Sequence, residues 1–338
     1  MDKNRGRERR MQAFEESSGK DAEEESRGNV FAFVGMGLLL LLTHVFALLL
    51  ATPFETAGMK AFENPESVFN AVFFFALVLC FTAAILVVLK FGGMKFVHLF
   101  MLFAVAATIF WVLSALIPII LNIFHVASVP SLDIFPLIVA LALTALLYFR
   151  PEWYVIDAVG LLVASGVASI FGISLQVLPV IVLLVILAVY DAVSVYGTKH
   201  MVSLASSVVE MRVPLLFVLP RRRKFSLLTA KGRAGRAERA EKAEKAEKAE
   251  QEGGKEQQEL GGGEAFFMGL GDAIIPAILA VSAYRYASFA SAIGSVAGTL
   301  AGYALLCTFA GRGKPHAGLP FLNSGAILGF LLGVSLGS

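Results

Sequence analysis

Two carboxylic acids stand out because they lie deep within apolar stretches of the chain. Asp191 and Asp272 each fall in the interior of such a stretch, whereas the other acidic residues lie in polar segments or, like Asp157, near the end of an apolar one. A charged side chain in hydrocarbon costs roughly 2.5–3.5 kcal/mol or more. Two carboxyl groups at close range cannot both ionise, so one stays protonated while the other can take a proton from water. That is the acid–base chemistry of aspartic proteolysis, although a structural polar pair or a proton site in a carrier would use the same residues.

The composition of the chain indicates that lipid surrounds most of it. Of its 338 residues, 57% are hydrophobic and 16% are charged, and the mean hydropathy is +0.75. Soluble domains are about 45–50% apolar and about 25% charged, so a soluble enzyme, a disordered protein and a disulfide-stapled secreted module are excluded. Cys80 and Cys307 both lie within apolar runs, which predicts small buried hydrophobic side chains without a redox or metal role.

Nine apolar stretches are long enough, or nearly long enough, to cross a bilayer, which takes about 20 residues. They are 30–51, 68–89, 96–124, 134–149, 155–173, 177–196, 265–282, 289–310 and 319–336. The fourth is the shortest, and Pro118 should kink the third. The sequence therefore predicts an all-α polytopic membrane protein with nine transmembrane helices.

An odd number of spans puts the two termini on opposite sides of the membrane. With nine spans, every Lys and Arg except Lys60 and Arg285 falls on the side of the N-terminus. Short cytoplasmic loops carry an excess of basic residues, so we expect a cytoplasmic N-terminus and an external C-terminus. The first run is too long, and too heavily preceded by charge, to be a cleaved signal peptide.

The polar parts of the sequence divide the chain into four segments. We expect an N-terminal tail at 1–28, transmembrane helices 1–6 at 29–196, a cytoplasmic loop at 197–264 and helices 7–9 at 265–338. The loop holds the apolar stretch VPLLFVLP, four basic residues at 221–224 suited to anionic lipid head groups, and an AEK repeat. A repeat of period three builds no apolar helix face, so this part is predicted to be a solvated linker.

The two deep carboxylic acids have the same expected depth in the membrane. Asp191 lies shortly before the cytoplasmic end of the sixth span, and Asp272 shortly after the cytoplasmic start of the seventh. At about 1.5 Å per residue, both lie roughly 8–12 Å below the cytoplasmic surface. Adjacent antiparallel helices would then place the two side chains face to face.

Short motifs surround both acids. Tyr190 precedes Asp191, and Asp272 closes the sequence GLGD that begins at Gly269. Glycines before the second acid let another backbone approach closely, as a peptide substrate requires. Here the chain resembles the presenilin/signal peptide peptidase family of intramembrane aspartyl proteases, which carries YD in its sixth span, GxGD in its seventh and PAL in its ninth. The first two motifs match in order, span number and depth.

The third motif departs from the family's pattern. Aligned with the family's PALP, the sequence before the ninth span reads Ala317-Gly318-Leu319-Pro320, with Ala in place of the first Pro. In the family this element shapes the active site and meets the substrate backbone. Because Pro320 disfavours helix at Leu319, we expect the segment to stay extended.

The resemblance implies an intramembrane aspartic endopeptidase of the cell membrane, similar to single-chain prokaryotic relatives of archaeal type. Asp191 and Asp272 would be the catalytic pair, one activating water and the other donating a proton to the scissile carbonyl. Substrates would be transmembrane helices or remnant signal peptides that unwind locally, with water arriving from the cytoplasmic side. The residues expected to shape the site and meet the substrate are Tyr190, Gly269, Leu270, Gly271, Ala317, Gly318, Leu319 and Pro320.

Other classes stay open from the residues alone. A proton- or cation-coupled transporter or channel could use the same aspartates, and a prepilin-type leader peptidase also carries GxGD but would cut at the membrane surface. No motif indicates a cofactor, a metal site, a nucleic-acid partner or an obligatory partner subunit. Glycine ridges such as Gly294-xxx-Gly298-xxx-Gly302 allow close helix packing, within the bundle or between copies of a homo-oligomer.

Overall fold

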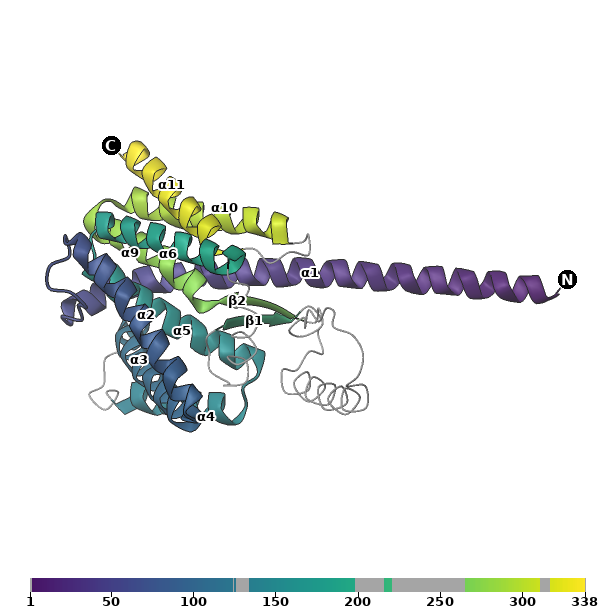
Figure 1. Ribbon diagram of the computed structural model, residues 1–338, viewed down its shortest axis with the longest axis horizontal. Helices are drawn as coiled ribbons and strands as arrows, with labels where there is room; N and C mark the ends of the chain where they lie inside the picture. The colour runs from purple at the N-terminus through teal and green to yellow at the C-terminus, as the bar shows by residue number, and fades with distance from the viewer. Residues whose placement is uncertain are drawn as a thin grey trace. The chain divides into compact units, whose positions relative to one another are not determined.

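The computed structural model describes residues 2–123, 125, 134–197, 216–220, 265–310 and 317–337. Helices make up almost all of this part of the chain, together with two short strands (Figure 1). The basic residues at 221–224, the AEK repeat and most of the predicted cytoplasmic loop lie outside the described residues. The predominantly helical, multi-span fold expected from the sequence is confirmed.

The helices follow the predicted apolar stretches closely. They are α1 (Asp2–Thr56), α2 (Val68–Lys90), α3 (Met94–Ile123), α4 (Phe135–Phe149), α5 (Trp153–Ser174), α6 (Val177–Gly197), α9 (Leu270–Tyr286), α10 (Phe289–Ala310) and α11 (Leu319–Gly337). By length and composition, 7 of them can cross a membrane. The other two, α4 with 15 residues and α9 with 17 residues, are shorter. Helix α1 begins at Asp2, well before the first apolar stretch.

Two strands form where the sequence analysis expected none. β1 (Leu216–Pro220) and β2 (Ala265–Gly269) pair in a two-stranded sheet. β1 belongs to the apolar stretch VPLLFVLP, and a short apolar run has no periodicity that separates strand from helix. β2 replaces the first residues of the predicted seventh span, so the helix begins only at Leu270. The residue pair Gly269 and Leu270 therefore joins the sheet directly to the helix that carries Asp272.

The chain divides into two compact units. The first comprises Met1–Met36 and Val218–Phe267. In it, Phe33 of α1 meets Phe266 of β2 edge to face, with ring centroids 4.8 Å apart. Gly35 leaves room for Leu219, whose nearest methyl would lie 3.0 Å from a Cβ at that glycine. Aromatic and aliphatic contacts thus hold this part of α1 against the strands.

The second unit, Gly37–Phe217 and Met268–Ser338, has α9 at its centre. Helix α9 packs against α5, α6, α10 and α11, and all its residues from Pro276 to Ala283 are buried. Alanines on several sides allow four helices to approach it. Its far end is fixed by two hydrogen bonds, from Ser282 Oγ to the Leu175 carbonyl at 2.7 Å and from Tyr286 Oη to the Ile173 carbonyl at 2.6 Å.

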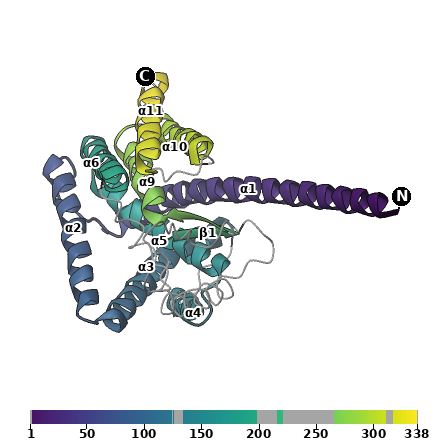
Figure 2. The same ribbon diagram turned by 45° about the vertical axis from the view of Figure 1, so that its right-hand side comes forward.

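Helix α2 packs against α6 on one side and is exposed over most of its surface. Ala71 is its one buried residue, and Cys80, which we expected to be buried, is exposed. Gly92, with φ at +81°, makes the turn into α3, and Figure 2 shows the two helices meeting at this turn. An apolar helix with this exposure needs hydrocarbon as its solvent, so α2 is a lipid-facing helix.

Helices α10 and α11 pack backbone against backbone. A Cβ at Gly298 would overlap the carbonyl oxygen of Gly325, and one at Gly294 would overlap the carbonyl oxygen of Gly329. The glycine ridges found in the sequence therefore meet each other within the chain, which is the packing expected of small residues between membrane helices.

Candidate active site

The start of α9 positions Asp272. Gly269 is the N-cap of this helix, so Asp272 is its third residue and lies in the first turn. From this position the carboxyl group reaches back toward Gly269, where a Cβ would lie 3.5 Å from Asp272 Oδ2. A carboxylate at the third position that returns to the N-cap is one half of a capping box. The GLGD sequence thus folds locally so that the acid stabilises the beginning of its own helix.

Asp191 lies near the other end of its helix, six residues before α6 ends at Gly197. Its side chain is largely buried. The backbone N–H of Leu319 donates to Asp191 Oδ2 at 3.1 Å. The first N–H groups of a helix have no partner within it, and here the N-terminus of α11 uses one of them to bind this carboxyl group.

The peptide unit between Gly318 and Leu319 lies between the two acids. Leu319 donates to Asp191, while a Cβ at Gly318 would lie 3.2 Å from Asp272 Oδ2. The two carboxyl groups also interact electrostatically with each other. Residues 191, 272 and 318–319, which are far apart in the sequence, are therefore brought together at one place in the second unit.

The segment 317–320 is not extended as expected. Helix α11 begins at Leu319, and the N–H groups of Phe321 and Leu322 both donate to the Gly318 carbonyl at 3.2 Å. Pro320 is thus the second residue of a helix, where its lack of an N–H group costs no intrahelical bond. The prediction was wrong because proline breaks a helix in its interior but is accepted in its first turn.

The remaining predicted site residues surround this centre in different ways. Gly271 is exposed, and a Cβ there would have only Ile275 Cδ1 within reach, at 4.0 Å. Leu270 is buried, with its Cδ1 3.2 Å from where a Cβ at Gly160 of α5 would lie. Tyr190 is 48% exposed, and its ring meets Phe75 of α2 at 5.7 Å.

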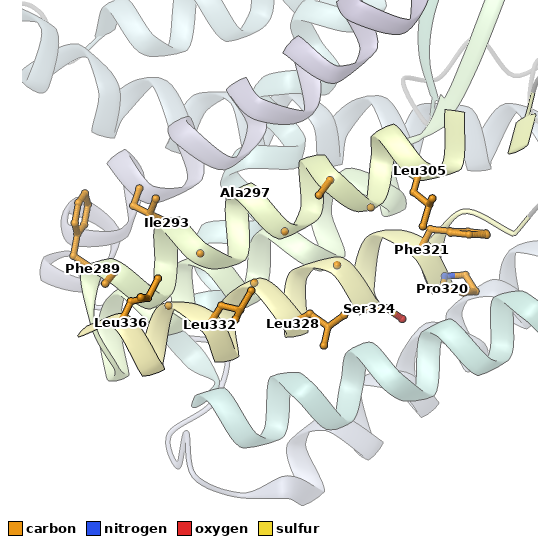
Figure 3. Close-up of a pocket in the computed structure, with 18 residues that line it drawn as sticks. Phe289, Ile293, Ala297, Leu305, Pro320, Phe321, Ser324, Leu328, Leu332 and Leu336 are labelled. Atoms are coloured by element: carbon orange, nitrogen blue, oxygen red, sulfur yellow. The ribbon is translucent and has the colours of Figure 1, made fainter. Parts of the chain in front are cut away.

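The last two predicted residues belong to α11 and the approach to it. Ala317 is buried. Pro320 lines a groove of about 1000 Å³ between α10 and α11. In Figure 3, Pro320 and Phe321 lie at one end of this groove, and Phe289 and Leu336 lie at the other. The lining contains neither Asp191 nor Asp272, so the groove begins beside the acids but is not their cleft.

One polar residue close to the site was missed by the sequence analysis. Asn323 is buried in α11, and its Nδ2 donates to the Leu184 carbonyl of α6 at 2.9 Å. The available signal was that Asn323 is the one amide side chain in an otherwise apolar span. In the part of the chain that the structure describes, no three His, Cys, Asp or Glu side chains come close enough to hold a metal ion.

A buried carboxyl group, Asp191, and a half-buried one, Asp272, on neighbouring membrane helices, with a backbone donor between them, are the arrangement of an aspartic hydrolase embedded in the bilayer. The family model described as signal-peptide peptidase, presenilin aspartyl protease matches residues 16–337. The chain therefore belongs to this family. It is a multi-pass membrane protein and an intramembrane aspartic endopeptidase. A transporter and a prepilin-type leader peptidase fit these findings less well.

Two solved structures are similar to this chain over nearly its whole length. One is a structure of a presenilin family intramembrane aspartate protease in space group C222, with 37% sequence identity, a TM-score of 0.63, and coverage of 90% of this chain and 99% of that chain. The other, in space group P2, has 39% identity and a TM-score of 0.62 and covers 89% of this chain and 97% of that chain. None of the curated protein sequences matches this chain.

Proposed function

We propose that Asp191 and Asp272 are the catalytic pair with which this endopeptidase hydrolyses peptide bonds within the membrane. The observation that carries the proposal is the convergence of both carboxyl groups on the Gly318–Leu319 peptide unit. A peptide unit of the substrate would have to lie beside the same two groups to be cut. The enzyme's own backbone thus marks where a carbonyl and an amide can meet both acids.

The proposed reaction uses one proton shared between the two acids. One carboxylate takes a proton from water as the water oxygen attacks the carbonyl carbon of the scissile bond. The other carboxyl group donates its proton to the carbonyl oxygen, which gives a tetrahedral diol. The first acid then passes its proton to the leaving nitrogen and the C–N bond breaks, while the second acid takes a proton back from one hydroxyl of the diol as the new C=O bond forms. The pair thus returns to one proton.

The substrate is a transmembrane segment that unwinds near the acids, because the hydrogen bonds of a helix shield its carbonyl groups. The exposed backbone at Gly271, where a side chain would meet only Ile275 at 4.0 Å, is the side from which this segment would approach. Gly269, Leu270, Ala317 and Pro320 would support the acids, and Tyr190 would border the site toward α2.

We further propose that the chain crosses the membrane nine times, with a cytoplasmic N-terminus and an external C-terminus. The segments 29–196 and 265–338 would then be membrane-embedded and 197–264 cytoplasmic. Helices α4 and α9 would be the two short crossings. At 15 and 17 residues they span roughly 22–26 Å, and a bilayer accommodates such short helices by local thinning.

A cluster of charges supports this topology. Lys60 and Arg285 are the two basic residues that nine spans place on the external side of the membrane, and both contact Glu55. Arg285 Nε lies 2.7 Å from a Glu55 carboxylate oxygen, and Lys60 Nζ lies 3.8 Å from Glu55. The end of α1, which carries Glu55, and the end of α9, which carries Arg285, therefore lie on one side. Labelling Lys60→Cys in whole cells with a membrane-impermeant maleimide should succeed without lysis, in a background that lacks Cys80 and Cys307.

The catalytic proposal is tested by neutralising each acid separately. Asp191→Asn and Asp272→Asn should each reduce cleavage of a synthetic transmembrane peptide to below about one per cent of wild type, because losing an acid–base group costs at least ~10²-fold. Both variants should fold, since neutralising a buried acid removes a desolvation cost. Mass spectrometry of the products should place the wild-type cut within the apolar stretch.

The matched control is Asp157→Asn, which changes another buried aspartate, in α5. Folded Asp157→Asn should cleave the peptide at a rate close to wild type. If either Asp191→Asn or Asp272→Asn keeps full activity, that aspartate is not a catalytic residue. Cleavage only at the membrane boundary of the peptide would instead favour a leader peptidase.

A further inference from the structure

Asn323 joins two of the helices that meet at the site. It lies one turn after Leu319 in α11 and is 1% exposed. Its Nδ2 donates to the backbone carbonyl of Leu184 in α6 at 2.9 Å. Within the described residues, Asn323 Oδ1 has no hydrogen-bond partner. Asn323 thus makes one specific hydrogen bond, to the Leu184 carbonyl, although its Oδ1 is left without a donor in apolar surroundings.

This bond and the contact at Asp191 lie along the same pair of helices. Leu184 is about two turns before Asp191 on α6, so both face the same neighbour. Leu319 and Asn323 are four residues apart on α11 and also share a face. Asp191 pairs with Leu319, and Leu184, which comes earlier on α6, pairs with Asn323, which comes later on α11. The two helices are therefore antiparallel. Two hydrogen bonds therefore fix one antiparallel interface.

The other contacts of this interface are apolar and fix the register poorly. Leu183 and Leu187 of α6 and Ala326 of α11 belong to one buried apolar cluster. Membrane helices gain no hydrophobic energy from meeting each other, so packing and interhelical hydrogen bonds decide how they align. A slide of one residue, about 1.5 Å along the axis, would take the Leu319 N–H out of hydrogen-bond reach of Asp191, which it now meets at 3.1 Å.

We propose that Asn323 is a positioning residue that holds α11 in register with α6 and so keeps the Leu319 N–H on Asp191. The inference rests on the proposed catalytic role of Asp191. A leucine of similar size would fill the same space without an unpaired acceptor, so the amide contributes its bond to Leu184 rather than packing. Asn323 itself touches neither aspartate.

The test compares Asn323→Leu, Asn323→Asp and the control Ser324→Ala, an exposed neighbour on the same helix. Each purified full-length variant is assayed in detergent with a fluorogenic single-span peptide. We expect Asn323→Leu to lower kcat roughly ten- to hundredfold, since a misplacement of about 1 Å can cost ~10²-fold. KM should change by less than about twofold, because the substrate contacts remain. Ser324→Ala should match wild type in kcat and in melting temperature.

Asn323→Asp provides a readout that a packing role would not give. A protonated carboxyl group can donate to the Leu184 carbonyl, whereas an ionised one cannot. The ratio of its kcat to the wild-type kcat should therefore rise as the pH falls, while the same ratio for Asn323→Leu should stay flat. If Asn323→Leu does not fold, the pH dependence of the kcat ratio for Asn323→Asp tests the positioning role by itself.

The outcomes separate this inference from the proposed function. A folded Asn323→Leu with wild-type kcat, an effect confined to KM, or an Asn323→Asp variant whose kcat is as low as that of Asn323→Leu at every pH would overturn the positioning role. Wild-type protein that cuts no peptide, or an Asp191→Asn variant that still cuts it, would overturn the catalytic proposal instead.

Discussion

At the scale of single residues, Leu319 contributes through its backbone. Its N–H donates to Asp191, and as the first residue of α11 it occupies a position where proline is readily accepted. Leu319→Pro should therefore delete this one donor while the helix still forms. We expect kcat to fall at least about tenfold, since one hydrogen bond to a charged group contributes about 1.5–3 kcal/mol. Peptide cleavage and thermal unfolding in detergent check the two halves of this prediction.

Leu319→Ala is the matching variant, because it removes the buried side chain and keeps the N–H. Truncating a buried leucine costs about 2–5 kcal/mol of stability, so the melting temperature should fall. The folded fraction should keep most of the wild-type kcat. The opposite ranking, with Leu319→Ala inactive and Leu319→Pro active, would assign the role to the side chain.

Gly318 limits the space beside the second acid. A Cβ at this position would lie 3.2 Å from Asp272 Oδ2, closer than an ordinary van der Waals contact of about 3.5–4.0 Å. Gly318→Ala should push the carboxyl group aside by a few tenths of an ångström and lower kcat roughly tenfold, because catalysis is sensitive to such displacements. Ser335→Ala, which changes an exposed hydroxyl at the far end of α11, should leave kcat as in wild type.

At the scale of elements, the glycine contact decides whether α10 and α11 can pair at all. A side chain at Gly298 would overlap the backbone of Gly325. Gly298→Val should separate the helices and destabilise the protein by more than the ~1–3 kcal/mol typical of overpacking, since backbone cannot move aside as a side chain can. Thermal unfolding followed by light scattering measures the loss.

The control for this substitution is Ala304→Val, at an exposed position on the same helix. It adds similar bulk toward lipid and should leave the melting temperature within a few degrees of wild type. Equal stability of the Gly298→Val and Ala304→Val variants would mean that α10 and α11 do not need backbone contact.

The ion pairs of Glu55 contribute less to stability than the glycine contact, because they are exposed to solvent. The Arg285 and Glu55 side chains are 45% and 24% exposed, and an exposed ion pair contributes only about 0–1 kcal/mol. The proximity of Arg285 and Lys60 to one carboxylate is therefore informative about topology and contributes little to stability. The bonds of Ser282 and Tyr286 to backbone carbonyls, which lie deeper, hold this end of α9.

At the scale of the whole molecule, the pairing of β1 with β2 brings the two ends of the charged connection together. The segment 221–264 leaves the sheet after Pro220 and returns to it at Ala265. Deleting 231–262 should therefore change kcat and KM by less than about twofold, because closure free energy changes by only ~0.6 kcal/mol per doubling of loop length.

A Gly/Ser replacement of the same residues separates length from composition in this prediction. It keeps the length of the connection and removes its charges. A folded protein that loses activity with either change would show that the AEK repeat takes part in function.

The sequence identified both acids because an ionisable group within an apolar span is rare and expensive, so Asp191 and Asp272 stood apart from every other acidic residue. The helices were also predictable, since lipid requires long uninterrupted apolar segments. The strands were not, because LFVLP is too short to show a period and its partner follows a long polar connection. The helical start at Leu319 depended on where proline falls within a turn, which only the position of the first hydrogen bonds reveals.

The contact at Asp191 divides the work between the two oxygens of one carboxyl group. Oδ2 accepts the Leu319 N–H, which makes it a weaker base than Oδ1, so in the proposed reaction Oδ1 would take the proton from the incoming water. With Asp191 in that role, the side from which the nucleophile reaches the scissile carbonyl would be selected before any substrate arrives. Attack would then favour one face of the carbonyl, and a peptide presented with its opposite face toward the acids would bind and be cut more slowly.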